Sequence, residues 1–400
     1  MVICRGMEST RSRSGYLPSL DGWRAIAISG VLMTHDLPWA IHGHSNIVWK
    51  GYGGYGVYLF FAISGVLICT RILRDEKSLG AFHIRDFYIR RLFRIQPAAF
   101  AYLAVIALFI ATGIVHERWH FWLGALLLYQ NFLFHTQNRT LIMAGYFTGH
   151  FWTLALEEHF YILLSLFLFF VRRRRAVVMA LILLCLVAGQ HGARNHGWYS
   201  EDTSTRRTFW LLQYLFVPAF LALTLDIEGV HRIAKRFLVP WVAFTGIFAV
   251  LSADYILHHG VAHFWHRSTF DMETNHLLLA LGFPVIATML HPESWTTKML
   301  EWKPLRFVGR LSYSIYVWHL LFLCTGFPDT HVTWAPLVFL GHRPARYIAI
   351  LATSCLSYYV IEKPLIRFGH RVAPPATPGH ADLAGTRPQP KQMVTVVAEG

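Results

Sequence analysis

The sequence predicts an all-α fold, a polytopic membrane helix bundle of about ten transmembrane helices plus one re-entrant or interfacial helix. Hydrophobic residues make up 54% of the 400 residues and charged residues only 14%, a balance that soluble multidomain proteins rarely have. Aromatic residues make up 15%, which suits a bundle with rings in its core and at both lipid interfaces.

Apolar stretches of nearly membrane-spanning length recur along the whole chain. They are Trp23 to Met33, Tyr55 to Ile72, Pro97 to Val115, Phe121 to Phe134, Phe151 to Val171, Ala176 to Gly189, Phe209 to Leu225, Phe237 to Leu257, His276 to Leu290, Leu311 to Phe327 and Tyr347 to Ile361. Phe121 to Phe134 is shorter than the roughly 20 residues that a span needs, so we expect it to be the re-entrant or interfacial helix. The first stretch lacks a small-residue cleavage site and is predicted to be a retained span.

The basic residues predict the orientation of the bundle. Lys and Arg alternate between loops: the outer loop Leu37 to Gly54 holds only Lys50, whereas the next loop is rich in arginine. We therefore expect both termini to be cytoplasmic, and no nucleic-acid partner despite the net charge of +14. The predicted parts are a cytoplasmic segment 1–16, a transmembrane domain 17–370 and a disordered tail 371–400.

The five cysteines lie far apart and without paired spacing. This pattern predicts neither a disulfide framework nor a cysteine metal site, and we assign no metal ligand in the chain.

Ionisable side chains inside apolar stretches are the candidates for function, because burying them in a membrane is costly. In the first stretch, Arg24 and His35 are eleven residues apart, which places them on one helix face about 16 Å apart. Asp21 precedes them in the segment Leu-Asp-Gly-Trp-Arg and is a candidate for the lining of the same passage.

An arginine-rich segment lies at the predicted cytoplasmic mouth of the third stretch. Arg90 and Arg94, one helical turn apart, are expected to clamp a phosphate together, while Arg91 points elsewhere. The plain alternative is charge that only sets topology.

Two further polar sets open later spans. Glu157 and Tyr161 share one helix face after Trp152, and only one of Glu157 and Glu158 can face a given cavity. The expected lining residues of these two sets are Trp152, Tyr161, Ser312 and Tyr316. Ser312, Tyr316 and His319 form a polar stripe on an otherwise apolar segment, which fits either catalysis or helix packing.

Two histidine patterns give weaker signals. His116-Glu117-Arg118-Trp119-His120 matches a zinc-protease motif, but it has no evident third ligand. A second group, His258, His259, His263 and His266, is expected to be solvated in an outer loop.

Taken together, the motifs resemble the acyltransferase-3 family of integral membrane O-acyltransferases over about Leu17 to Arg367. The matching positions are Arg24 with His35, Gly54 to Gly65, Arg90 with Arg91 and Arg94, Trp152 with Leu154 and Glu157, Ser312-Tyr313 with His319, and Tyr359 to Pro364 around Glu362. The chain departs from the family pattern at Tyr58, where an aspartate is common, and at Thr153, where serine is usual.

The resemblance implies transfer of an acyl group, most commonly acetyl, from cytoplasmic acyl-CoA to a hydroxyl of an extracytoplasmic carbohydrate such as O-antigen, exopolysaccharide or another glycan. It also implies a multi-pass protein of a bacterial inner membrane and no tightly bound cofactor. Arg90, Arg91 and Arg94 are expected to bind the donor phosphates. We also expect either direct transfer to the carbohydrate or a separate extracytoplasmic partner protein that completes it.

Within that reaction, His35 is the expected general base, since imidazole titrates near neutral pH. Arg24 either positions the donor or stabilises the developing oxyanion, and Glu157 and His319 assist. An acyl-histidine intermediate stays open. The competing interpretations are a transporter or flippase of an anionic glycan and a membrane zinc metalloprotease.

Overall fold

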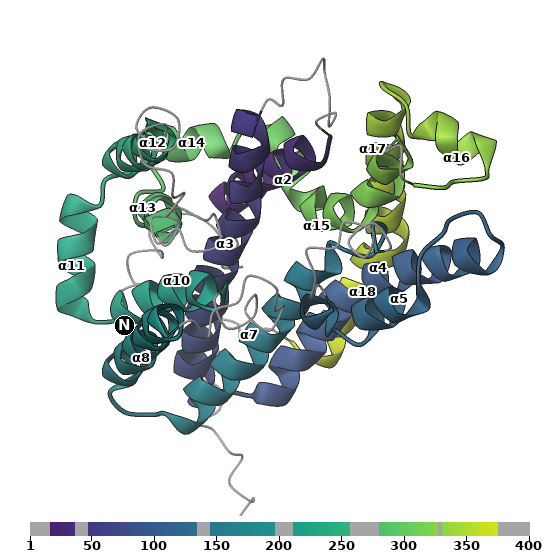
Figure 1. Cartoon of the computed structure of the whole chain (residues 1–400). Helices are drawn as coiled ribbons and strands as arrows, with labels where there is room; N and C mark the ends of the chain where they lie inside the picture. The colour runs from purple at the N-terminus through teal and green to yellow at the C-terminus, as the bar shows by residue number, and fades with distance from the viewer. Residues whose placement is uncertain are drawn as a thin grey trace, which may run out of the picture.

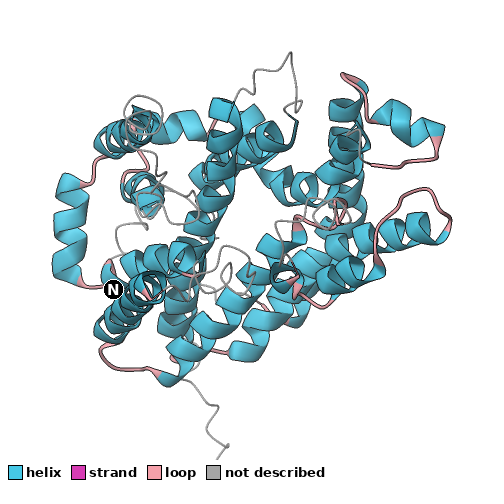
Figure 2. Ribbon diagram, viewed as in Figure 1, coloured by secondary structure: helices cyan, strands magenta, loops and turns pink. Residues whose placement is uncertain are grey.

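The computed structural model describes residues 17–36, 47–133, 145–196, 211–256, 280–326 and 330–374. Within these ranges every extended regular element is a helix, and the one β-type pairing is an isolated antiparallel bridge between Val115 and Val332 (Figure 2). The all-helical fold class is therefore confirmed. The predicted segment 1–16 and most of the predicted tail 371–400 lie outside the described residues.

The helices alternate with short connections along the described ranges. Their bounds are α2 Pro18–Asp36, α3 Ile47–Leu79, α4 Ile84–Ala111, α5 Trp119–Leu126, η1 Gln130–Phe132, α7 Phe151–Phe170, α8 Arg175–Asn195, α10 Gln213–Thr224, α11 Glu228–Phe237, α12 Pro240–Ile256, α13 Gly282–Leu290, α14 Trp295–Leu300, α15 Lys303–Leu323, η5 Cys324–Gly326, α16 Ala335–Leu340, α17 Ala345–Leu356, the π-helix η6 Ser357–Glu362 and α18 Lys363–Val372. Thus α18 continues two residues into the tail predicted from residue 371.

Helix α3 forms the centre of the bundle. In Figure 1 it runs through the middle of the molecule, with α8 and α10 to α13 on one side and α4, α5 and α15 to α18 on the other. Helix α2 packs against both α3 and α15. Glycines allow these close approaches, because a Cβ at Gly56 would lie 2.3 Å from the carbonyl oxygen of Ala27 and one at Gly309 1.8 Å from that of Asp21.

Three described helices are long and apolar enough to cross a membrane: residues Tyr55–Leu79 of α3, α4 and α7. A fourth crossing is formed if α10 and α11, which meet at an angle of 106°, are counted as one broken span. In the described parts of the predicted spans Phe209 to Leu225 and His276 to Leu290, helices α10 and α13 have 12 and 9 residues. The predicted count of ten therefore stays a prediction.

The described part of the predicted segment Phe121 to Phe134, residues 121–133, does not form one crossing helix. Helix α5 covers 8 residues, and the 3-residue 3₁₀ helix η1 follows after a turn in which Leu128 has a positive φ of 59°. Both elements are too short to cross a bilayer. This agrees with the prediction of a re-entrant or interfacial segment.

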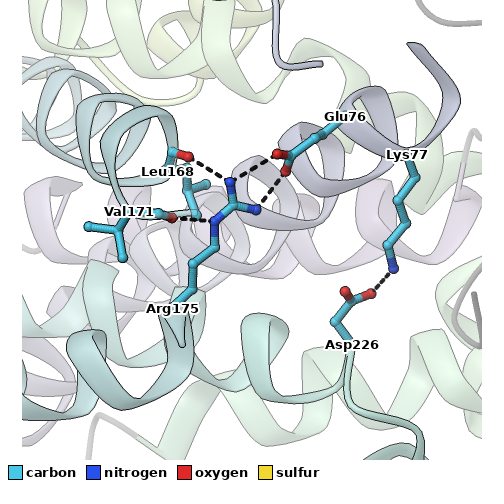
Figure 3. A network of polar contacts seen from close by, with 6 residues as sticks. All are labelled: Glu76, Lys77, Leu168, Val171, Arg175 and Asp226. Carbon is cyan, nitrogen blue, oxygen red and sulfur yellow. Dashed lines mark hydrogen bonds and ion pairs between the residues drawn. The ribbon is translucent and has the colours of Figure 1, made fainter. Parts of the chain in front are cut away.

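A network of paired charges joins the ends of α3, α7, α8 and α10 (Figure 3). Arg175 donates to both carboxylate oxygens of Glu76, at 2.6 and 2.9 Å, and to the carbonyl oxygens of Leu168 and Val171 at the end of α7. The adjacent Lys77 pairs with Asp226, which follows α10. Because these carbonyls have no partner inside their own helix, Arg175 both caps α7 and ties it to α3.

Candidate active site

A cavity of about 130 Å³ lies between α2, α3, α4, α7 and α15. Phenylalanine and aliphatic side chains form part of its wall, together with a polar set contributed by all five helices. The charged and hydroxyl-bearing lining residues are Arg24, Ser64, Arg91, Arg94, Thr153, Glu157, Tyr161, Arg310, Ser312, Tyr313 and Tyr316. The cavity thus collects residues from four of the motifs singled out in the sequence.

The lining carries a surplus of positive charge. It holds four arginines, Arg24, Arg91, Arg94 and Arg310, and a single carboxylate, Glu157. The guanidinium carbon of Arg91 lies 4.7 Å from the centre of the Tyr161 ring, a cation–π contact that holds it on the cavity wall. Such a lining in a low-dielectric setting favours an anionic ligand.

The expected pairing of Arg90 with Arg94 at the cavity is wrong. The Nη2 atom of Arg90 lies 2.6 Å from a carboxylate oxygen of Asp75 on α3, so Arg90 is used in an ion pair. Arg91, which was expected to point elsewhere, lines the cavity with Arg94. An i,i+3 pair also shares a helix face, and only the position of α3 decides which of the two faces meets the cavity.

Glu157 is held by two hydroxyl donors inside the cavity. The Ser64 hydroxyl donates to its Oε1 at 2.5 Å and the Tyr161 hydroxyl to its Oε2 at 3.2 Å. Glu157 and Tyr161 therefore share a face, as the sequence predicts, and the neighbouring Glu158 is absent from the described lining. Ser64 lies within the matching segment Gly54 to Gly65, but the sequence does not indicate its contact with Glu157, which only the packing of α3 against α7 produces.

His35 and His319, 284 residues apart in the chain, meet next to the cavity. Nε2 of His319 lies 3.4 Å from Nδ1 of His35, and the ring centroids are 5.0 Å apart. Neither histidine belongs to the cavity lining described above. Tyr316 connects the two places, because it lines the cavity and its ring centroid lies 5.5 Å from that of His319.

His150 is a third histidine in this group, and it is not among the site residues predicted from the sequence. Its ring centroid lies 5.2 Å from that of His319, and the Tyr316 hydroxyl donates to its backbone carbonyl at 2.7 Å. It lies two residues before Trp152, in a segment already recognised by its motif. Its polar side chain at a helix start was the one signal that could have selected it.

The remaining predicted residues divide between the cavity and the packing around it. Ser312 and Tyr316 line the cavity, as expected. Asp21 does not line the cavity. It is 3% exposed, and its Oδ1 lies 3.6 Å from Nη1 of Arg24, so it forms an ion pair with that guanidinium from outside the lining. Trp152 is also absent from the lining, and its ring packs edge-on against Phe61, because neighbouring helix residues differ by about 100° in direction.

The zinc-protease pattern has another explanation. Helix α5 begins at Trp119, so His116 lies before it and the two histidines are not one turn apart on a helix. Glu117 is buried and accepts hydrogen bonds from the backbone N–H of Phe147, at 2.8 Å, and from the Thr148 hydroxyl. In the described part of the chain, no three His, Cys, Asp or Glu side chains gather as a metal site. The group His258 to His266 lies outside the described residues.

Fold and site together define a helical membrane protein with a basic internal cavity beside a pair of histidines. The family described as "Acyltransferase domain", acyltransferase-3, matches residues 17–363. Because that match covers most of the chain, the chain belongs to this family, and the resemblance inferred from its motifs is confirmed.

Curated relatives carry related names. The chain is 26% identical to a peptidoglycan O-acetyltransferase of Listeria monocytogenes over 90% of this chain and 58% of the relative. It is 28% identical to a putative peptidoglycan O-acetyltransferase of Bacillus subtilis over 89% of this chain and 56% of the relative. It is 25% identical to a putative O-acetyltransferase of Staphylococcus aureus over 76% and 50%. The chain spans about half the length of these relatives, and no solved structure matches it.

Proposed function

We propose that this chain is a membrane O-acyltransferase that moves an acyl group, acetyl in the first instance, from acyl-CoA to a hydroxyl of a cell-envelope carbohydrate. The observation that carries the proposal is the basic cavity next to His35 and His319, in a chain of the acyltransferase-3 family. The names of the relatives support acetyl as the group and a cell-wall glycan as the class of acceptor.

The donor end of the proposed site is the arginine cluster. Arg91 and Arg94 of α4 line the same cavity as Arg24 of α2, and planar guanidinium groups suit the phosphates of a CoA donor. Arg71 of α3 adds to the positive potential, because it interacts electrostatically with both Arg24 and Arg91. Arg90 contributes to the same field while it is held by Asp75.

The reacting end is His35, which lies about 16 Å from Arg24 along α2 by helix geometry. His35 removes the proton from the acceptor hydroxyl, and the oxygen attacks the thioester carbonyl carbon. The carbon–sulfur bond breaks, and the proton passes from His35 to the departing CoA sulfur. The same ring nitrogen serves as the nucleophile if an acyl-histidine forms first.

In this proposal Arg24 stabilises the donor or the developing oxyanion, and Glu157 limits repulsion among the arginines. Glu157 interacts electrostatically with Arg24 and Arg91 while Ser64 and Tyr161 occupy its oxygens. We place the protein in a bacterial inner membrane with both termini cytoplasmic, so that the basic cavity opens to the compartment that holds acyl-CoA.

The test replaces His35 by alanine in cells that express the full chain. Mass spectrometry of the cell-envelope glycans is expected to show loss of ester-linked acetyl groups, while the variant still inserts into the membrane at wild-type level. Ester groups retained at the wild-type level would exclude the catalytic role. A transporter predicts unchanged esters in this variant and no acetyl-CoA consumption by the purified wild-type chain.

A further inference from the structure

The hydrogen bonds around His35 fix which of its ring nitrogens carries the hydrogen. Nδ1 lies 2.9 Å from the carbonyl oxygen of Val31, one turn earlier in α2. A carbonyl oxygen only accepts hydrogen bonds, so Nδ1 is the N–H and Nε2 holds the lone pair. Of the two ring nitrogens, only Nε2 is then able to take up a proton.

His319 carries its ring hydrogen on the same nitrogen as His35. Its Nδ1 lies 2.6 Å from the carbonyl oxygen of Tyr316 and therefore carries the hydrogen. Its Nε2 holds the lone pair and lies 3.4 Å from Nδ1 of His35. The lone pair of one ring thus faces the N–H of the other, and both neighbours of the His35 N–H are acceptors.

His319 is fully buried and enclosed by aromatic rings. The ring of His150 lies edge-on to it at a centroid distance of 5.2 Å, and the ring of Tyr316 is tilted against it at 5.5 Å. His150 is itself fastened to α15 by its Nε2, which lies 3.1 Å from the carbonyl oxygen of Val317. These contacts hold the His319 ring with its lone pair aimed at His35.

We propose that His319 is a positioning residue for acyl transfer. Its Nε2 accepts from the Nδ1–H of His35, keeps His35 in the tautomer whose Nε2 is free, and stabilises the imidazolium that forms when Nε2 takes the acceptor proton. This rests on the proposed function for the reaction itself. A neutral imidazole here occupies the place that a carboxylate holds behind the histidine of a Ser-His-Asp triad.

The charged groups next to this pair do not offer a competing partner. Asp36 follows His35 directly, but its carboxylate is held by Arg343 at 2.9 Å and by Arg346 and Tyr347 of α17. His150 and Tyr316 are the other titratable side chains that face His319. The N–H of His150 donates to the carbonyl oxygen of Val317. His319 is therefore the side-chain acceptor at Nδ1 of His35 among the described residues.

The first test measures the tautomers directly in the unmodified chain. The full-length protein is labelled with ¹⁵N-histidine in lipid nanodiscs, and two-bond ¹H–¹⁵N correlations report which nitrogen of each ring carries hydrogen. His35→Asn and His319→Asn difference spectra assign the two rings. Both are expected to show Nδ1–H with bare Nε2; an Nε2–H on either ring overturns the proposal, whether or not the chain transfers acetyl groups.

The second test uses acetyl-CoA as the donor probe and measures thiol release together with glycan esters. His319→Phe keeps an aromatic ring without a lone pair and is expected to lose activity about 100-fold, in the range of a lost catalytic hydrogen bond. His319→Gln, whose side-chain oxygen restores an acceptor, is expected to stay within about 10-fold of the wild type. Equal activity of the two variants rejects the role of the lone pair.

A matched control is His331→Phe. His331 is exposed and pairs with His116 at a ring distance of 6.2 Å, so the same change is made in a histidine pair away from the cavity. Its activity is expected to equal that of the wild type. If the wild type consumes no acetyl-CoA, the proposed function fails, while the tautomer measurement still decides the assignment of His35 and His319.

Discussion

Two arginine-rich regions of this chain differ in how their charge is balanced. At the helix ends in Figure 3, Arg175 meets the carboxylate of Glu76 and two backbone carbonyls, and Lys77 meets Asp226. The cavity lining has four arginines and one carboxylate; Arg24 is paired with Asp21 outside the lining, and neither Arg91 nor Arg94 has an ion pair among the described residues.

This difference distinguishes a structural role, in which charged groups stabilise the fold, from a role in binding a ligand. A fully paired group gains its hydrogen bonds when the chain folds and needs nothing more. A surplus of partly buried positive charge destabilises the folded protein, and a bound anion offsets this unfavourable free energy only in the complex. The two regions should therefore respond in opposite ways to the same kind of substitution.

The largest expected effect is the loss of donor binding when a cavity arginine is neutralised. In Arg94→Gln, the affinity for acetyl-CoA is expected to fall about 100-fold, since a charge-assisted hydrogen bond is worth roughly 1.5–3 kcal/mol. The thermal unfolding midpoint should stay constant or rise. Isothermal titration and thermal melts of the purified chain measure both, and a lower midpoint with unchanged affinity contradicts the binding role.

Next in size is a loss of stability when the paired region is broken. Arg175→Gln removes the bidentate contact to Glu76 and the caps on Leu168 and Val171, and we expect about 2 kcal/mol of destabilisation with donor affinity unchanged. A double-mutant cycle with Glu76→Gln isolates the pair. Additive losses in that cycle would show that the two side chains do not interact.

A smaller and mixed effect is expected at Glu157. In Glu157→Gln, one carboxylate oxygen becomes an amide N–H₂, so the hydroxyl of Ser64 or Tyr161 that donates to it has to turn and accept, and charge-assisted hydrogen bonds become neutral ones. Turnover is expected to fall about 10-fold, the size of one weakened hydrogen bond. Donor affinity should rise, because the cavity becomes more positive. Steady-state kinetics measures turnover and donor affinity separately. A loss of donor affinity alongside the loss of turnover would argue against the electrostatic role of Glu157.

The smallest expected effect concerns a buried carboxylate with neutral partners only. Burial raises the pKa of Glu117, in the connection between α4 and α5, from 4.5 to about 7. The folded chain therefore binds this proton more tightly than the unfolded chain, so the stability that it supplies is present below pH 4.5 and is lost as pH rises through 7. We expect Glu117→Gln to gain about 1 kcal/mol at pH 8 relative to the wild type and nothing at pH 4, a fraction of the 1.36 kcal/mol per pKa unit of full linkage.

Thermal melts of both proteins across that pH range measure the difference. Glutamine keeps one acceptor for the Phe147 N–H and offers a donor to Thr148, so the variant should retain the fold. A constant difference between the two melting curves at all pH values would contradict the assignment of Glu117.

Much of the site could be predicted because each motif lies on a single helix. Helical periodicity places Glu157 and Tyr161 on one face, as well as Ser312 and Tyr316, and the structure confirms both pairs at the cavity. Rotation about a helix axis is less certain from periodicity alone. For this reason periodicity favours Arg90 over Arg91 as the partner of Arg94 at the cavity and places Asp21 and Trp152 in the lining. In the structure Arg91 lines the cavity, whereas Arg90, Asp21 and Trp152 are absent from the lining.

Contacts between distant segments could not be predicted in the same way. Nothing in the local sequence of α2 indicates that His35 meets His319 of α15, or that His150 packs on that ring. Likewise, the run Arg172 to Arg175 indicates only topology, whereas the fold makes Arg175 a cap and an ion-pair partner.

The sequence alone determined that this chain is a helical membrane protein of the acyltransferase-3 type, because hydropathy, charge distribution and motif order are properties of single segments. The tertiary structure decided which arginines face the cavity, which histidines meet and which ring nitrogen of His35 is free. Those features depend on how helices far apart in the chain pack side by side, and periodicity within one helix does not contain that information.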